Sequence, residues 1–83
     1  MKAEPPNLSG GKDIDRRISN HVRLQLRIAD IRQVEVQRAL GHSRSTSRRR
    51  LHGERPITGS DLVQIARLTG LTVTELFPAD LRA

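Results

Sequence analysis

A short basic segment bounded by turns, residues 41–53, constrains this chain more than any other feature. Ser43 suits the N-cap of a helix because its hydroxyl can accept a hydrogen bond from a free backbone amide, and Gly53 suits the left-handed residue after the helix. Between these ends the segment carries four arginines: Arg44, Arg48, Arg49 and Arg50. An unpaired guanidinium is too costly to bury. The segment therefore predicts a surface helix that faces water or an anion.

The length of 83 residues limits the chain to one domain with a small core of Leu, Ile and Val, since Phe77 is the only aromatic residue. The absence of cysteine excludes disulfides and a Cys-based zinc site, and the three histidines lack ligand spacing. We therefore expect neither a metal nor a cofactor. No apolar run approaches a membrane span or a secretory signal, so we expect a cytoplasmic, nucleoid-associated protein.

The charge is strongly basic and unevenly placed. Lys and Arg number 15 against 9 acidic residues, for a net charge of +6. Both lysines lie in the first twelve residues, whereas residues 44–55 hold five arginines and one glutamate. The planar fork of arginine suits phosphates and guanine edges. Solvated charge is the simpler interpretation of such a composition, but the clustering favours a nucleic acid as the partner.

Apolar residues at helical spacing predict an all-α chain. Residues 1–12 contain two prolines and two glycines and are expected to form a disordered arm. Helices are expected over residues 13–29, 31–40, 44–51, from 58 or 60 to 69, and 72–77. Capping pairs are expected at Asp30 with Gln33, Thr58 with Asp61, and Thr72 with Glu75. The predicted domain spans residues 13–78, and residues 79–83 form a frayed tail.

The first of these helices has two apolar strips. Its main stripe contains Ile14, Ile18, Val22, Leu26 and Ala29. Leu24 and Ile28 form a narrower strip on the flank, which is more often a satellite of the core than a surface for a partner.

From about Val22 to Phe77 the sequence resembles the Cro and phage-repressor type of helix-turn-helix family. Its landmarks, each weak alone, occur in order and at the family's spacing: residues 33–36, 40–43, 45–46, 53–56, 62, 65–66, 70–72 and 75–77. The resemblance implies a five-helix, lambda-repressor-like bundle. It also implies that residues 31–40 and 44–51 form the helix-turn-helix, with the second helix entering the major groove of DNA.

The resemblance also implies roles for individual residues. Arg44, Ser45 and Arg49 fall at base-reading positions, with Arg49 favoured because it lies on the same face as Ser45. Gln33 is expected to touch the DNA backbone and brace the reading helix. The phosphate-contacting positions are Ser43, Thr46, His52 and Arg55. Arg48 and Arg50 are expected at phosphates or in solvent, and His42 and His52 in structural roles at the two turns.

The chain departs from the family pattern in four places. Gln37 and Arg32 replace a small alanine and a Ser/Thr cap. Ser47 replaces a buried Val or Ile, and Arg50 replaces an apolar residue whose role Leu51 takes over. We expect Ser47 to lie on the inward side of its helix, one turn before Leu51.

These observations predict a sequence-specific double-stranded DNA-binding transcriptional regulator, namely a phage or prokaryotic repressor, and no enzyme. One reading helix covers too few base pairs, so we expect a homodimer that can form on its operator. The favoured dimer surface contains Leu71, Val73, Leu76 and Leu81, with the strip of Leu24 and Ile28 as the other candidate. The chain offers no room for a separate ligand-sensing module.

Two other functions stay open at this point. One is an antitoxin-like or accessory regulator acting through a protein partner. The other is a module that uses its basic face to bind RNA or a protein. Phe77 alone could stack a base, which disfavours single-stranded RNA.

Overall fold

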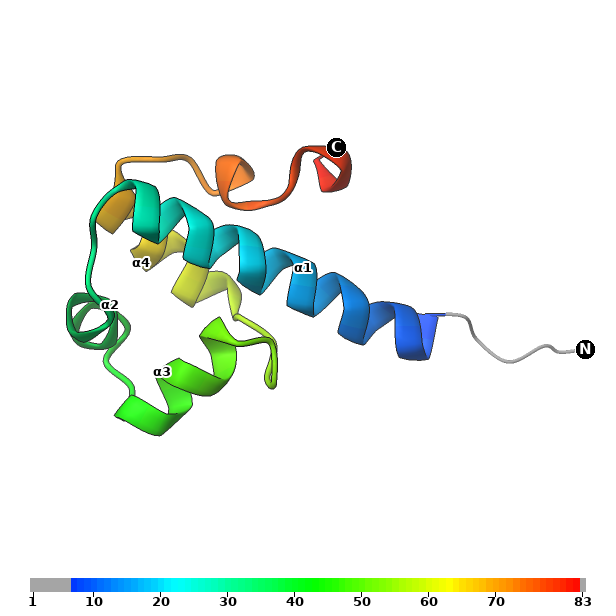
Figure 1. Ribbon diagram of the computed structural model, residues 1–83, viewed down its shortest axis with the longest axis horizontal. Coiled ribbons are helices and arrows are strands. Elements are labelled where there is room, and N and C mark those ends of the chain that lie inside the picture. Colours follow the sequence, from blue (N-terminus) through cyan, green and yellow to red (C-terminus); the bar gives the residue numbers. More distant parts are fainter. Residues whose placement is uncertain (1–6, 83) are drawn as a thin grey trace, which may run out of the picture.

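The computed structural model describes residues 7–82 as four α-helices followed by two short 3-10 turns (Figure 1). The helices are α1 (Asn7–Ile28), α2 (Gln33–Leu40), α3 (Arg44–Leu51) and α4 (Gly59–Thr69), and the turns are η1 (Thr74–Leu76) and η2 (Ala79–Leu81). Residues 7–82 contain no strand, which confirms the all-α prediction. Within them, none of the helices is both long and apolar enough to cross a membrane.

One core holds the elements together. All four α-helices and η1 contribute buried side chains to it: Val22, Leu26, Val36, Leu51, Leu62, Ile65, Ala66 and Leu76. Helix α1 runs along the core, and its N-terminal half projects beyond the other helices (Figure 1). Burial of these aliphatic side chains, at roughly 25 cal/mol per Å² of apolar surface, is the main force that fixes the arrangement.

Helix α1 begins earlier than expected. Residues 7–12, predicted to belong to a disordered arm, are helical, and residues 1–6 lie outside the described part. A glycine costs only about 1 kcal/mol relative to alanine in a helix, so a helix held by its C-terminal half can continue through Gly10 and Gly11. The apolar stripe is buried only where the body lies beneath it: Val22 and Leu26 are buried, whereas Ile14 and Ala29 are exposed.

The narrow strip on α1 does not join the core. Leu24 and Ile28 are 44% and 69% exposed, so the expectation that they form a satellite of the core is wrong.

The turn between α1 and α2 differs from its prediction. Helix α2 begins at Gln33, two residues later than expected, and Asp30 adopts a left-handed backbone with φ of 58°. The predicted pair of Asp30 and Gln33 is therefore wrong. The backbone amide of Arg32 instead donates to Glu35 Oε1 at 2.9 Å, which satisfies one of the free amides at the start of the helix.

The predicted fifth helix is shortened to η1. Thr72 and Glu75 do form the expected capping pair, since the Thr72 amide donates to Glu75 Oε1 at 2.9 Å. Pro78 follows too soon for an α-helix to develop. Leu76 is fully buried and Phe77 half-buried.

Residues 79–82, expected to fray, form η2 and the residue after it. The C-terminal segment over residues 75–82 runs along α1 (Figure 1) and contacts it at two points. Arg17 pairs with Asp80 at 2.6 Å, and His21 Nε2 lies 3.1 Å from the carbonyl oxygen of Glu75.

Candidate nucleic-acid interface

The basic segment forms a helix with the predicted bounds. Helix α3 begins after Ser43, whose hydroxyl accepts a hydrogen bond from the Thr46 amide at 3.2 Å. It ends before Gly53, whose φ of 77° lies in the left-handed region. Both turn residues therefore act as the sequence predicts, and they set the short length of the helix.

The inner side of α3 is fixed to the body of the protein. Ser47 and Leu51 are 0% and 4% exposed, which confirms that Ser47 faces inward. The hydroxyl of Ser19 on α1 donates to the carbonyl oxygen of Arg50 at 2.8 Å and so joins the two helices. Ser47 Oγ has no hydrogen-bond partner in the structure. A buried hydroxyl without a partner is costly, so Ser47 is a weak point of an otherwise well-anchored side.

Arg50 also belongs to the inner side. Its Nη1 donates to Asp61 Oδ2 at 2.7 Å, and the Asp61 side chain is only 4% exposed. Asp61 also caps α4, because it accepts from the Thr58 amide at 3.1 Å. His42 Nε2 lies 2.9 Å from Asp61 Oδ1 and 2.7 Å from Arg50 Nη1. We call Asp61, Arg50, His42 and Thr58 the Asp61 cluster; it joins α3, α4 and the turn after α2.

The Asp61 cluster holds its carboxylate in the charged form. Burial by itself would raise the pKa of Asp61, but hydrogen bonds from Arg50, His42 and Thr58 together outweigh it, and the pKa lies below its ordinary value. Arg50 was expected at a phosphate or in solvent. Its half-buried guanidinium contacts this carboxylate instead.

Most of the other predicted site residues lie on the outer side of α3 or next to it. Seven of them are exposed besides the cap Ser43: Gln33, Arg44, Ser45, Arg48, Arg49, His52 and Arg55. Two hollows flank the helix. The larger hollow has a volume of about 460 Å³ and is lined by Gln33, Arg44, Ser45, Arg48 and His52. The smaller hollow has a volume of about 300 Å³ and is lined by Thr46, Arg49, Arg50 and Arg55. Ser45 therefore shares a hollow with Arg48 rather than with Arg49.

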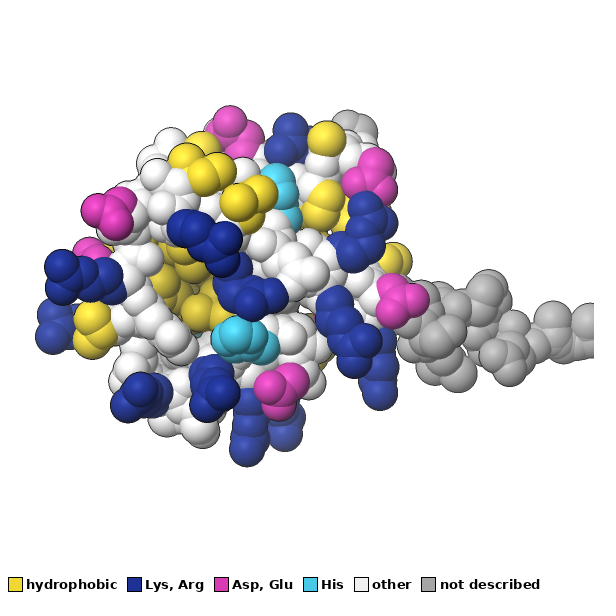
Figure 2. Space-filling view, viewed as in Figure 1, with side chains coloured by type: hydrophobic (Ala, Val, Ile, Leu, Met, Phe, Trp, Pro, Cys, Tyr) yellow, Lys and Arg dark blue, Asp and Glu magenta, His cyan; other side chains and the backbone are white. Residues whose placement is uncertain are grey.

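The outer face of α3, defined as Arg44, Ser45, Arg48 and Arg49, carries positive charge without compensation. Helix α3 contains no acidic residue. Within residues 7–82, carboxylates within 4.0 Å engage only two arginines, Arg17 and Arg50. In the space-filling view, Lys and Arg side chains spread over α2, α3 and the adjacent side of α1 (Figure 2). This face can therefore attract an extended anion.

Helix α1 adds arginines that were not among the predicted site residues. Arg23 Nη1 lies 3.2 Å from His52 Nδ1, and the side chain of Arg16 lies against Gly53. Arg16, Arg23 and Arg27 are spaced by seven and four residues, which puts them on one side of a helix. That spacing was present in the sequence and could have marked this face as an extension of the basic surface.

The predicted dimer surface is only partly available. Leu76 is fully buried in the core and cannot contact a second copy, so its assignment to an interface is wrong. Leu71, Val73 and Leu81 are half-buried. Residues 7–82 contain no group of three or more His, Asp or Glu side chains that could hold a metal ion.

Comparisons of the chain with protein-family models, with curated proteins and with solved structures gave no match.

Proposed function

We propose that this protein is a sequence-specific double-stranded DNA-binding regulator, a repressor of phage or prokaryotic type. In this proposal a helix-turn-helix is formed by α2, the turn over residues 41–43 and α3, within a lambda-repressor-like arrangement. The observation that carries the proposal is the outer face of α3. Its arginines are exposed and have no carboxylate partner within residues 7–82, while the opposite side of the same helix is anchored through Leu51, Ser19 and Asp61.

The geometry suits the major groove of DNA. That groove admits one α-helix, and a helix that stands out from the body on an anchored inner side can enter it. Arg44, Ser45 and Arg49 would meet base edges near the start and middle of α3. Gln33 lines the same hollow as Arg44 and Ser45, so it can reach the backbone beside them. Arg55 lines the hollow on the other flank and would meet a phosphate there.

Ser43 and Thr46, two of the predicted phosphate-contacting residues, already use their hydroxyls in hydrogen bonds within the protein. The hydroxyl of Ser43 accepts from the Thr46 amide and donates to Thr46 Oγ1 at 3.0 Å, so both hydroxyls are engaged in the cap. A phosphate at this corner would be held mainly by backbone amides at the start of α3. Phosphate contacts release counterions and supply most of the affinity, whereas contacts to base edges supply the specificity.

Selection of bound duplexes from a random library tests the proposal. We expect one enriched motif for the protein. The double variant Arg44→Gln/Arg49→Gln should lose that motif. The control Arg38→Gln/Arg67→Gln removes the same charge from exposed positions on α2 and α4 and should keep it. No enrichment, or equal loss in both double variants, would show that the outer face of α3 does not read DNA.

We further propose that two copies bind one near-palindromic operator, with half-sites about 10 base pairs apart. Leu71, Val73 and Leu81 remain the favoured contact surface after Leu76 is removed from it. Because this surface is small, the dimer forms on the DNA. Sedimentation with and without the selected duplex tests this, and a 1:1 complex on a non-symmetric site at saturating protein would contradict it.

The exposure of Leu24 and Ile28 supports a second candidate, an accessory regulator that binds a protein partner. These side chains lie on α1, away from α3, so a partner could bind them while the outer face of α3 stays free. A 1:1 complex with DNA that keeps its sequence preference would favour this candidate over the homodimer.

A further inference from the structure

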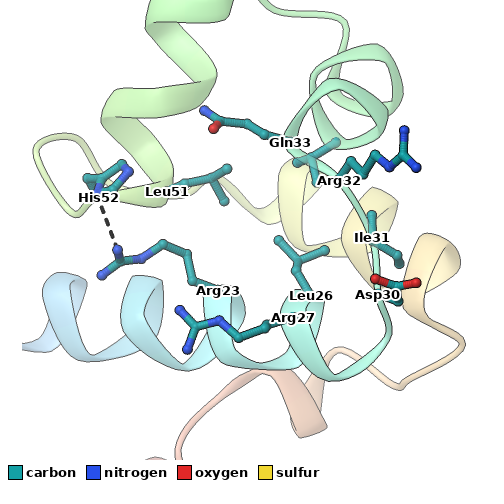
Figure 3. A pocket seen from close by; sticks show the side chains of 10 residues that line it. Arg23, Leu26, Arg27, Asp30, Ile31, Arg32, Gln33, Leu51 and His52 are labelled. Atoms are coloured by element: carbon teal, nitrogen blue, oxygen red, sulfur yellow. Dashed lines mark hydrogen bonds between the residues drawn. The ribbon is translucent and has the colours of Figure 1, made fainter.

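A third recess lies beside the outer face of α3, between the end of α1, the start of α2 and the end of α3 (Figure 3). Its floor is apolar: Leu26, Val36 and Leu51 are 5%, 1% and 4% exposed, and Ile31 is half-buried beside them. The recess has a volume of about 310 Å³. In the space-filling view, a hydrophobic floor is visible from outside between dark blue side chains (Figure 2). We call this site the α1–α2 recess; it is large enough for a small organic molecule.

The rim of the α1–α2 recess is basic. Arg23 and Arg27 rise from α1, and Arg32 stands on the other side in the linker before α2 (Figure 3). Asp30 is the only carboxylate among the lining residues. None of the three arginines forms an ion pair within the part of the chain that the structure describes. An apolar floor with an unbalanced positive rim is complementary to an anion that also has an apolar body.

Arg23 adds a specific reason to expect an acceptor here. Its Nη1 lies 3.2 Å from His52 Nδ1, and its Nη2 donates to Asn20 Oδ1. Its Nε is buried and has no hydrogen-bond partner in the structure. A buried donor without an acceptor is destabilising. A small rotation of this guanidinium would present its fork to a carboxylate, the planar anion that it binds best.

We propose that the α1–α2 recess binds a small organic acid with an apolar body of about eight carbons, a size that suits small-molecule pockets. The carboxylate lies at the rim formed by Arg23, Arg27 and Arg32, and the apolar body covers Leu26, Val36 and Leu51. A neutral apolar molecule would leave the rim charge unpaired. A small inorganic anion would leave the apolar part of the recess unfilled. Both are therefore weaker ligands than a molecule that combines the two parts.

Binding in the recess reaches the outer face of α3. Gln33 and His52 line both the recess and the larger hollow beside α3. A bound carboxylate places negative charge next to these two residues and also covers Arg23, which contacts His52. If α3 reads DNA as proposed above, the acid repels the phosphate that Gln33 meets and weakens operator binding. Ligand sensing then needs no second domain.

The binding test uses octanoate, octanol and acetate as probes and follows the methyl signals of the full chain by NMR. Octanoate should shift the signals of Leu26, Val36 and Leu51 in a saturable way, and octanol and acetate should do so far more weakly. The variant Arg27→Gln/Arg32→Gln changes two exposed residues and should weaken octanoate binding about tenfold, since it removes two of the three positive charges at the rim. The control Arg38→Gln/Arg67→Gln removes the same charge away from the recess and should bind as the unaltered protein does.

Three results would overturn the site. These are absence of the shifts, equal binding of octanol and octanoate, or shifts centred on the exposed Leu24 and Ile28, which would indicate adsorption to the outside of α1.

The coupling to DNA is measured separately, by fluorescence anisotropy with the selected duplex in octanoate or acetate at equal ionic strength. Octanoate should raise the dissociation constant for DNA severalfold relative to acetate. In the variant Arg27→Gln/Arg32→Gln, the ratio of the dissociation constants in octanoate and acetate should fall toward one. An unchanged ratio in the unaltered protein would overturn the coupling. Absence of any duplex preference in acetate would count against the proposed function, whereas the NMR titration tests the recess without DNA.

Discussion

The two sides of α3 use the same residue type for different purposes. Arg49 and Arg50 are neighbours in the sequence and lie about 100° apart around the helix axis. Arg49 is exposed and has no carboxylate partner in the described part of the chain, whereas Arg50 is half-buried and donates to Asp61. The number of basic residues in such a run therefore overstates the positive charge that a ligand can reach. One arginine of the run stabilises the position from which the others can act.

The largest expected effect comes from breaking the inner side. Asp61→Asn keeps the shape of the side chain but leaves the half-buried guanidinium of Arg50 without its anion. Because removal of one charge leaves the other buried without a counter-ion, we expect the free energy of unfolding to fall by about 3 kcal/mol. Urea denaturation measures this.

Asp80→Asn is the matched control. It removes the other Asp–Arg pair of the described chain, between exposed residues Arg17 and Asp80. Exposed pairs contribute little because water and salt screen them, so stability should hardly change. Similar losses in both variants would mean that the Asp61 cluster is not the special support of α3.

The outer side should affect binding and not folding. Under the proposed function, Arg49→Ala should cost roughly 1–3 kcal/mol on the preferred duplex and blur one base position. Arg55→Ala should instead weaken all duplexes alike and lower the slope of log affinity against log salt by about one. Binding titrations over a panel of duplexes and salt concentrations separate the two. Identical specificity profiles would contradict the division between reader and phosphate contact.

Replacing a serine on each side of α3 by valine should give a smaller effect and allows a direct comparison of the two sides. Ser47 is 0% exposed and its hydroxyl lacks a partner, so Ser47→Val should stabilise the fold by about 1 kcal/mol through added apolar burial. Ser45→Val makes the same exchange in the same helix at an exposed position and should change the melting temperature little. A lower melting temperature for Ser47→Val would mean that this part of the core has no room for the added carbons.

The smallest expected effect is on the pH dependence of stability. The pKa of Asp61 in the fold lies below its ordinary value of 3.8, although burial acts in the opposite direction, because Arg50, His42 and Thr58 donate to the carboxylate. A lowered pKa means that the stabilisation is complete above the unfolded value and is lost as the pH falls through the folded value. Between pH 5 and about pH 3, the unaltered protein should therefore lose more stability than Asp61→Asn. Parallel acid curves would show that Asp61 is not the group responsible.

Local signals in the sequence predicted much of the fold. The bounds of α3 follow from Ser43 and Gly53, and the start of α4 follows from the pair Thr58 and Asp61. The predicted ends of the first and last helices were wrong. Helix α1 begins at Asn7, before its predicted start, although residues 7–12 lack the apolar periodicity that predicts the rest of the helix. The last helix was predicted over residues 72–77, but only the 3-10 turn Thr74–Leu76 forms before Pro78.

The candidate site was predictable to a similar extent. The exposed positions of Arg44, Ser45, Arg48 and Arg49 follow from the short, bounded helix that carries them. The pairing of Arg50 with Asp61 spans eleven residues and depends on how α3 and α4 pack, so no spacing rule could indicate it. The same is true of the α1–α2 recess, because its lining residues come from three helices that only the tertiary fold brings together.

The tight turn after α3 also limits how this sequence can vary. A Cβ on Gly53 would lie 2.9 Å from Cγ and 3.0 Å from Cα of Arg16, and a backbone atom cannot swing aside as the end of a side chain can. Gly41 and Gly70 share its left-handed conformation but have open space around them. Asparagine and aspartate, which tolerate that conformation, could therefore replace Gly41 or Gly70 during sequence drift. Position 53 admits no side chain, so among functional variants of this chain it should be the least changeable of the three glycines.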